Sequence, residues 1–495
     1  MKAKVLRRWP VIFLLCVFAY QIVTHSFLLS ISAHSGQVAI PWMMNQGRPL
    51  YGDILEQHAP GSSVIVAIAQ RLLPFETLTV TRLLNIALVL VISLIVYGVA
   101  FSLGNRRHLV AVVAVLIWVW WEPIYGNILF YFDTLLGFGI VLAVFIWVAM
   151  EKYSSSWLAA LSVGVILGGV TIFKQHGWAA VILFAIWLFL FRRHSSPRLF
   201  DFLTYGLGAT LFPILIIGVV ALQGNLAEYI YWNWGFNFTG LMPSNIMTGD
   251  FFRKLVLTNV FVPVFLGLLF WRYRDQDNWI LLALMWLAGS MTLIPRFDEI
   301  HVMGSLPATS IMSSLALTYP IDLLGRVLSS IRRRQVSETS IFLSGTMFAV
   351  SLGWIWTGVA PFFGGGGTPG YEELKPVAEL LESFSQADDT LFILPETDST
   401  PQLHVLSGLQ PPGTWVKGWS WYLRAPNVID MLVNEWTEQP PNFIVVFPDL
   451  LEPSQAEVKR LMTFLNMNYQ YVEWVEMVEN HGDALLYRFE ATNQK

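Results

Sequence analysis

A polar stretch near the N-terminus holds the first group of residues that could do chemistry. It spans residues 34–62, reads HSGQVAIPWMMNQGRPLYGDILEQHAPGS, and contains Asp53, Glu56 and His58 between two long apolar runs. A carboxylate in such a place can take the proton of a reacting hydroxyl group as a general base. Asp53, in the run RPLYGD, also suits an ordinary turn. We expect this stretch to contribute to a polar site.

Three further groups of polar residues stand beside other apolar runs. They are Asp133 in FYFDTLLG, Lys174, Gln175 and His176 in FKQHGW, and Arg296, Asp298, Glu299 and His301 in PRFDEIH. Simpler roles exist for some of them: Lys174 could reach to a membrane interface, and Asp133 could pair with a neighbouring helix. The i, i+3 spacing of Asp298 and His301 is weak evidence for a divalent metal, so we predict no metal and no other cofactor.

The composition indicates the setting in which these residues act. The chain is 55% hydrophobic and 13% charged, and its mean hydropathy is +0.55. Soluble globular proteins are nearer about 25% charged. A single cysteine, Cys16, excludes an intrachain disulfide. We therefore expect a polytopic membrane protein that contacts membrane lipids and has no nucleic-acid partner.

The apolar runs predict an all-α bundle of about eleven transmembrane helices. The predicted spans are 10–32, 82–102, 109–121, 130–149, 157–173, 178–191, 201–222, 256–271, 279–294, 304–320 and 339–359. We interpret the first as a retained helix, because no small-residue cleavage pattern follows it. Of the 23 basic residues before Tyr371, 16 fall in one alternating set of connections. The positive-inside rule places that set in the cytoplasm.

This orientation puts the N-terminus inside and all four polar groups outside. We expect Asp53, Glu56, His58, Asp133 and the groups around Lys174 and Arg296 to line one outward-facing cavity, because charged residues at membrane depth are usually functional. The outer connection 223–255 is rich in aromatic residues, which is typical of a segment at the membrane surface. An aromatic belt around helix ends explains any single tryptophan equally well.

The residues after the last span predict a separate domain outside the membrane. From Tyr371 onward the chain carries 19 acidic and 7 basic residues, net −12, whereas the remainder is net +8. Alternating helical and strand patterns indicate a small α/β domain. We predict a transmembrane domain at 1–360, a glycine-rich linker at 361–370 and a soluble domain at 371–495.

Several of these motifs resemble the GT-C superfamily of membrane glycosyltransferases, in its ArnT-like (glycosyltransferase family 39-like) and RgtA/B/C/D-like branches. The first outer loop of those proteins has a G-x-x-Y-x-D element followed by P-G, which here are Gly47, Tyr51, Asp53, Pro60 and Gly61. FKQHGW and PRFDEIH are similar to later outer turns of the RgtA/B/C/D-like branch. One feature departs from the family. Its usual first-loop acid, which stands just before a glycine, is replaced by His34-Ser35-Gly36.

The resemblance implies transfer of a sugar from a polyprenyl-phosphate donor to an unknown glycan, lipid or protein acceptor, at the outer face of a bacterial or archaeal cytoplasmic membrane. It implies a catalytic base, for which we name Asp53 first and Glu56 or His34 as alternatives. It also implies cations on the donor phosphate, for which we name Lys174, His176 and Arg296. The substrate cavity would add Tyr51, His58, Asp133, Gln175, Asp298, Glu299 and His301. The alternatives are a catalytically inactive scaffold of the same fold, or a transporter or flippase for lipid-linked glycans.

Overall fold

The computed structural model describes residues 9–29, 31–126, 128–151, 156–192, 198–241, 248–271, 276–294, 297–332, 369–396, 399–451, 456–476 and 482–489. The chain divides into two compact units. Unit 1 comprises Met1–Ser30, Leu84–Ile216 and Ser244–Gly366. Unit 2 comprises Ile31–Leu83, Ile217–Pro243 and Gly367–Lys495.

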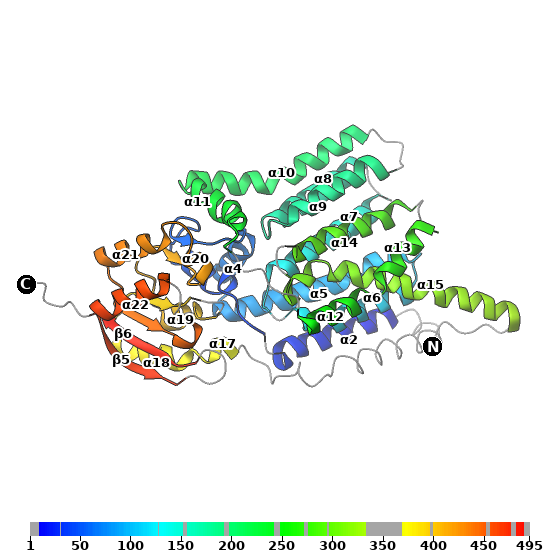
Figure 1. The fold of residues 1–495 in the computed structure, drawn as a ribbon. Coiled ribbons are helices and arrows are strands. Elements are labelled where there is room, and N and C mark those ends of the chain that lie inside the picture. The colour runs from blue at the N-terminus through cyan, green and yellow to red at the C-terminus, as the bar shows by residue number, and fades with distance from the viewer. Residues whose placement is uncertain are drawn as a thin grey trace, which may run out of the picture. The chain divides into compact units, whose positions relative to one another are not determined.

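Unit 1 is a bundle of helices (Figure 1). All or most of each of the following lies in it: α2 (Trp9–Val23), α5 (Thr77–Leu103), α6 (His108–Tyr125), α7 (Phe132–Met150), α8 (Ser156–Thr171), α9 (Gly177–Ile186), α10 (Arg198–Leu222), α12 (Gly249–Asn259), α13 (Val262–Trp271), α14 (Asp277–Ser290) and α15 (Leu306–Arg332). Short π-helical turns, η1 (Thr24–Leu28) and η3 (Trp187–Phe191), extend α2 and α9. Two 3₁₀ turns, η6 (Met291–Leu293) and η7 (Glu299–Gly304), precede α15.

Helices stand at every predicted span up to 304–320, and the last, 339–359, lies outside the described residues. Six helical segments are long and apolar enough to cross a membrane: Trp9–Leu28, Thr77–Leu103, His108–Tyr125, Phe132–Met150, Leu199–Leu222 and Gly249–Trp271. Ser156–Thr171 and Gly177–Phe191 are apolar but shorter. Together with the composition, these segments make the chain a multi-pass membrane protein.

One predicted span differs in detail from the structure. The pattern predicts a helix over 256–271, whereas helical structure begins at Gly249 and is interrupted between α12 and α13. Thr248 caps the start of α12 by accepting a hydrogen bond from the Phe251 N–H at 3.2 Å. Pro263 lies in the first turn of α13, where its missing N–H is tolerated, and its ring favours a new start over a continuous helix.

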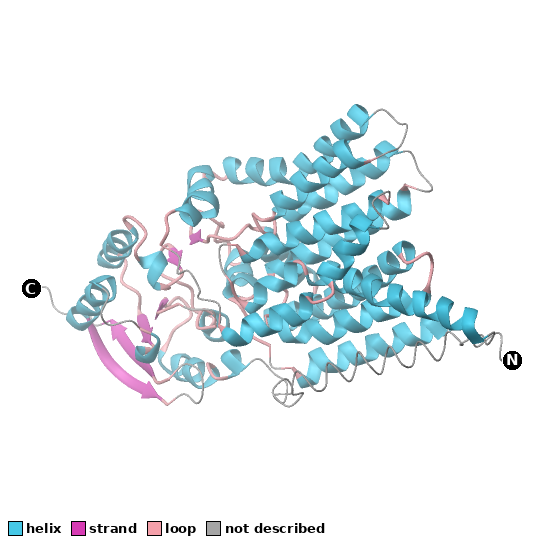
Figure 2. Ribbon diagram, turned by 45° about the vertical axis from the view of Figure 1, so that its right-hand side comes forward, coloured by secondary structure: helices cyan, strands magenta, loops and turns pink. Residues whose placement is uncertain are grey.

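Unit 2 contains every described strand (Figure 2). Its strands are β1 (Ile54–Leu55), β2 (Leu391–Leu394), β3 (Trp415–Val416), β4 (Phe443–Val446), β5 (Tyr469–Val475) and β6 (Ala484–Phe489). Its helices are α3 (Ala39–Asn45), α4 (Gly61–Leu72), α11 (Leu226–Ile230), α17 (Pro369–Glu372), α18 (Lys375–Phe384), α19 (Gln402–Ser407), α20 (Ser420–Leu423), α21 (Val428–Glu438) and α22 (Ala456–Asn468). Short helical turns complete it: η2 (Ser35–Gln37), η4 (Tyr231–Gly235), η5 (Phe236–Phe238) and η9 (Pro448–Leu450).

Four strands form a mixed sheet in the order β2-β4-β6-β5. β2 and β4 are parallel, and the other two pairings are antiparallel. Alternate residues of β2 face opposite sides. Leu391 and Ile393 pack in one core with α18 and α19, whereas the Phe392 ring lies 4.4 Å from that of Trp436 in α21. Helices therefore cover both faces of this sheet.

A second, two-stranded sheet joins the first outer loop to the C-terminal residues. β1 and β3 run parallel, with Ile54 opposite Trp415 and Leu55 opposite Val416. The segment that we predicted as a separate domain, 371–495, thus shares a compact unit with 31–83 and 217–243. Most of the predicted linker, residues 361–368, lies outside the described residues.

Candidate functional site

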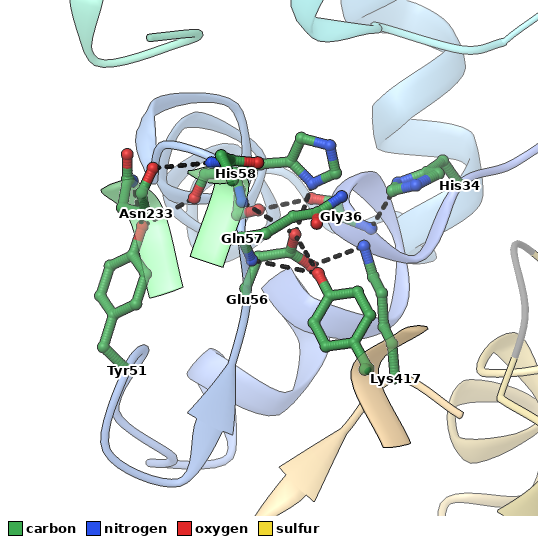
Figure 3. Close-up of polar contacts among 11 residues, drawn as sticks. His34, Gly36, Tyr51, Glu56, Gln57, His58, Asn233 and Lys417 are labelled. Carbon is green, nitrogen blue, oxygen red and sulfur yellow. Dashed lines mark hydrogen bonds and ion pairs between the residues drawn. The ribbon is translucent and has the colours of Figure 1, made fainter. Parts of the chain in front are cut away.

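The carboxylate of Glu56 is the centre of a buried polar cluster in unit 2. Its Oε2 lies 2.7 Å from the Lys417 Nζ, and both side chains are only 3% exposed. Its Oε1 contacts the His58 Nδ1 and accepts a hydrogen bond from the His58 backbone N–H at 3.0 Å. The Tyr422 hydroxyl lies 3.5 Å from the same oxygen. Figure 3 shows the carboxylate facing the Lys417 ammonium group.

The two-stranded sheet explains how Glu56 meets a residue 361 positions further along the chain. The parallel register pairs Leu55 with Val416, so the next residues of the two strands, Glu56 and Lys417, lie side by side. Arg48 holds the approach to β3 in place, because its guanidinium donates to the Gly413 carbonyl at 2.6 Å and to the Gln410 side chain at 3.2 Å. The pairing of the two backbones therefore places the side chains of Glu56 and Lys417 within reach of each other.

The surroundings of Glu56 keep it ionised. Burial works to raise the pKa of Glu56, but Lys417 and then His58 outweigh burial and lower the pKa below its usual range. Burial raises the pKa of Tyr422 well above its ordinary value, so its hydroxyl stays protonated. That hydroxyl accepts the Gln57 backbone N–H at 3.1 Å and can donate its own proton toward Glu56.

His58 is the most exposed partner of Glu56, with 18% of its side chain exposed. Its backbone is fixed from both ends. The N–H donates to Glu56, and the carbonyl accepts the Tyr51 hydroxyl at 2.7 Å. The Asn233 side chain donates to that same hydroxyl at 3.1 Å. The ring of His58 is thus held against Glu56, as a general base is held by an orienting carboxylate.

Aromatic side chains pack around Tyr422, on its side of the Glu56 cluster. The ring of Tyr422 stacks on Trp232 with centroids 5.5 Å apart and lies 5.0 Å from Phe236. All three are buried. Trp232 and Phe236 come from the aromatic segment 223–255, for which the sequence predicted a place at the membrane surface. Both rings pack within unit 2 against Tyr422, whose hydroxyl faces Glu56.

His34 occupies the place where the resembled family has its first-loop acid. Its side chain is buried and caps the turn η2, because Nδ1 accepts the Gly36 backbone N–H at 3.0 Å. Burial, and after it the charges of Lys417 and His58, hold the pKa of His34 well below its usual value. The neutral ring therefore carries its proton on Nε2. Its acceptor nitrogen is engaged with Gly36 and is poorly placed to take another proton.

Asp53 lies away from the Glu56 cluster, on the surface of unit 2. Tyr51 adopts a left-handed backbone with φ 70° and donates its N–H to the Ile54 carbonyl at 2.7 Å, which makes a tight turn around Asp53. The Asp53 carbonyl accepts the Trp415 N–H at 2.7 Å. The described hydrogen bonds of Asp53 are thus backbone bonds, and its exposed side chain interacts electrostatically with Arg48.

A second buried cluster lies in unit 1 and contains four of the predicted residues. The Lys174 Nζ binds both carboxylate oxygens of Asp133, at 2.6 and 2.7 Å. The His301 Nδ1 lies 3.6 Å from the Asp133 Oδ2 and 3.2 Å from the Asp298 Oδ1. Asp133 stands in the first turn of α7, where a negative charge is favoured by the helix dipole. A Cβ at Gly137 would lie 2.5 Å from the Met303 carbonyl, so glycine is needed for η7 to approach α7 this closely.

The remaining predicted residues are more scattered. Glu299 pairs with Lys254 at 2.6 Å, and both are partly exposed. His176 and Gln175 are half-buried beside Lys174 in the chain, and Arg296 lies outside the described residues. Within the described part of the chain, no group of three or more histidine, cysteine or acidic residues could hold a metal ion.

Several buried polar residues were not predicted from the sequence. Lys417 and Tyr422 stand in the run GTWVKGWSWYLRA, where a lone lysine among tryptophans was the available signal. In unit 1, His25 Nε2 lies 3.0 Å from the Glu122 Oε2, and both side chains are buried. A histidine and a glutamate within apolar runs were visible in the sequence and went unused.

Comparison with solved structures identifies proteins that share the fold of this chain. The chain is similar to ArnT from Cupriavidus metallidurans in the apo state, with a TM-score of 0.61 and 12% identity over 98% of both chains. The same protein bound to undecaprenyl phosphate gives a TM-score of 0.59, also at 12% identity over 98% of both chains. An Archaeoglobus fulgidus oligosaccharyltransferase tethered with an acceptor peptide gives 0.54 at 12% identity, over 88% of this chain and 69% of that one.

A further similarity is to the arabinofuranosyltransferase AftD from Mycobacteria, with a TM-score of 0.53 and 13% identity over 98% of this chain. The match covers only 40% of AftD. No protein-family model matches the sequence, and no curated protein matches it by sequence. The likeness is therefore one of structure, and it extends over nearly the whole chain. The chain has the fold of the GT-C glycosyltransferases.

Proposed function

We propose that this protein transfers a sugar from a polyprenyl-phosphate donor to an acceptor hydroxyl at the outer face of a cytoplasmic membrane. The observation that carries the proposal is the buried, ionised Glu56, held on the first outer loop by Lys417 and His58. The fold supports it, because ArnT has been solved with undecaprenyl phosphate bound. We also propose that the N-terminus is cytoplasmic and that residues 371–495 lie outside.

The proposed reaction is a displacement at the anomeric carbon. The acceptor oxygen forms a bond to that carbon, and the bond from the carbon to the phosphate oxygen breaks. The polyprenyl phosphate leaves with the electron pair of the broken bond. The acceptor proton passes to a base of the protein, whose contribution is typically ~10²–10⁴-fold. Beyond the donor and the acceptor, no oxidant, reductant or further substrate is needed.

We assign the base to the Glu56–His58 pair. His58 is the more exposed partner, so it is the group that an acceptor hydroxyl can reach. Its Nδ1 is engaged with Glu56, so the ring takes up a proton at Nε2. The ionised Glu56 then stabilises the imidazolium that forms, as in other pairs of histidine and carboxylate. Asp53 is a weaker candidate, because its side chain is exposed and lies outside this cluster.

For the leaving phosphate we retain Lys174, His176 and Arg296 as the proposed cations. Lys174 is buried and already binds Asp133, so its charge is compensated in the absence of substrate. A phosphate that binds Lys174 must share it with Asp133 or displace that carboxylate. The dependence of donor binding on Lys174 is therefore the decisive test of this part of the proposal.

The proposal is tested by reconstitution of the purified full-length chain into liposomes with radiolabelled polyprenyl-phosphate sugars. We expect labelled product and free polyprenyl phosphate to form in equal amounts. Absence of transfer from every donor in a panel of hexoses and pentoses, with the protein still folded, would favour the inactive scaffold. The observation that favours the scaffold is His34, which occupies the family's acid position and has its acceptor nitrogen bonded to Gly36.

A further inference from the structure

The segment from Lys417 to Tyr422 is anchored at both ends to Glu56. Lys417 binds one carboxylate oxygen at 2.7 Å, and the Tyr422 hydroxyl lies 3.5 Å from the other. Between these anchors stand Trp419 and Trp421. Their rings are stacked, with centroids 4.5 Å apart and planes inclined by 16°. The two indoles are therefore held on a short, fixed segment next to the proposed catalytic pair.

The two indoles differ in what they offer a ligand. Trp419 is half-buried, so part of its surface is accessible. Trp421 is 9% exposed, and its Nε1–H is buried without a hydrogen-bond partner among the described residues. An indole N–H can only donate, and buried donors in folded proteins are nearly always paired. A ligand that brings an acceptor atom to this position would pair that donor.

We infer that Trp419 and Trp421 form a sugar-binding subsite, in which a sugar ring packs on Trp419 and one of its oxygens accepts the Trp421 Nε1–H. A sugar ring combines an apolar face of C–H groups with hydroxyl oxygens at its edge, and the two indoles match these two features. A lipid chain could use the apolar surface but has no acceptor for the N–H. This inference rests on the proposed function, because it takes the ring to belong to the donor sugar or to an acceptor glycan.

Binding can be measured without turnover. Saturation-transfer NMR on the full-length protein in nanodiscs would use the methyl glycosides of glucose, mannose, galactose and arabinose, with cyclohexanol as an apolar ring that lacks the sugar hydroxyls. We expect transfer to the ring C–H protons of at least one glycoside and not to cyclohexanol. Trp419→Ala should abolish it, and Trp419→Phe should retain most of it. Trp474, 50% exposed on β5, supplies the matched control Trp474→Ala, which should change nothing.

Trp421→Phe separates the hydrogen bond from the stacking. It keeps an aromatic ring and removes the N–H, so we expect glycoside Kd to rise about tenfold. The melting temperature should stay the same or rise, because an unpaired buried donor is removed. An unchanged Kd in Trp421→Phe, or equal binding by wild type and Trp419→Ala, would overturn the inference. So would a wild-type protein that binds none of the glycosides.

Steady-state kinetics then shows whether the bound sugar ring belongs to the donor or to the acceptor. If the subsite holds the donor sugar, Trp421→Phe raises the KM for donor, whereas a rise in the KM for acceptor assigns it to an acceptor glycan. The two proposals fail separately. Glycoside binding by a protein that transfers no sugar would refute the proposed function alone. Sugar transfer that is insensitive to Trp419→Ala and Trp421→Phe would refute the subsite alone.

Discussion

Glu56 and Lys417 form an ion pair of 2.7 Å in which each side chain is only 3% exposed. Removing one partner from such a pair leaves an unpaired buried charge, which typically costs about 3–5 kcal/mol, whereas removing both is often close to neutral. The pair therefore couples two roles. It holds the first outer loop against β3, and it fixes the ionisation state of the proposed catalytic pair.

A double-mutant cycle tests this coupling. We expect Glu56→Gln and Lys417→Met each to lower the free energy of unfolding by about 3–5 kcal/mol. The double variant should be more stable than either single variant, because no charge is left unpaired. Denaturant unfolding of the four proteins in the same detergent measures the cycle. Additive losses would mean that the two side chains do not interact energetically.

The same double variant separates catalysis from folding. Glu56→Gln/Lys417→Met should be folded and yet slower in sugar transfer by about 10²–10⁴-fold, because the base has lost its carboxylate. His58→Gln should lose a similar factor. Asp53→Asn is the matched control, since it neutralises the exposed acid three residues earlier, and it should retain nearly full activity. A larger loss in Asp53→Asn than in the double variant would return the role of base to Asp53.

We expect the lowered pKa of His34 to make the stability of the folded protein depend on pH. Its pKa is well below the ordinary value of 6.5 in the folded protein, so between pH 6.5 and lower values the unfolded state takes up a proton that the folded state does not. Stability should therefore fall as the pH decreases from about 7.5 to about 5. The Glu56 contribution is still complete in this range, because it is lost only as the pH falls below the ordinary carboxyl pKa of 4.5 and through the lowered folded pKa.

His34→Gln can keep the hydrogen bond from Gly36 and removes the titrating ring. We expect it to reduce the stability change between about pH 7.5 and about pH 5, to which His176 also contributes because burial lowers its pKa to about 3, while leaving the loss at lower pH. Thermal unfolding of both proteins across this range provides the measurement. Identical slopes for wild type and variant would show that His34 is not the group responsible.

The role of Lys174 is tested by its effect on donor binding. Lys174→Met leaves Asp133 without its cation, so the pair variant Lys174→Met/Asp133→Asn is the appropriate comparison for a folded protein. If Lys174 holds the donor phosphate, the pair variant should raise the KM for donor about tenfold or more and leave the KM for acceptor unchanged. A folded pair variant with normal KM for donor would make Lys174 a structural partner of Asp133.

Topology is tested by reporter fusions. The asymmetry of 16 basic residues against 7 before Tyr371 predicts cytoplasmic signals after Arg107, Arg193 and Arg334. A fusion after Gly370 should report the outer side. A cytoplasmic signal after Gly370 would change the number of spans and would remove the proposed site from the outer face.

Local sequence patterns are enough to locate most helices of unit 1. Apolar length is a local property, so the predicted span 130–149 matches α7 (Phe132–Met150) within a few residues. The grouping of Asp133, Lys174 and His301 followed in the same way, because each stands near the end of a helix that the sequence already showed.

The residues that complete the cluster around Glu56 are brought there by contacts that no local pattern predicts. β1 and β3 are two residues long each, too short for a periodic signal, and their pairing brings Lys417 to Glu56 across 361 positions of sequence. Our preference for Glu56 over Asp53 rests on the left-handed turn at Tyr51, which leaves Asp53 exposed and leads into the short strand before the buried Glu56. The G-x-x-Y-x-D spacing favours Asp53, whereas burial and ion pairing, which arise from contacts between segments that are distant along the chain, favour Glu56.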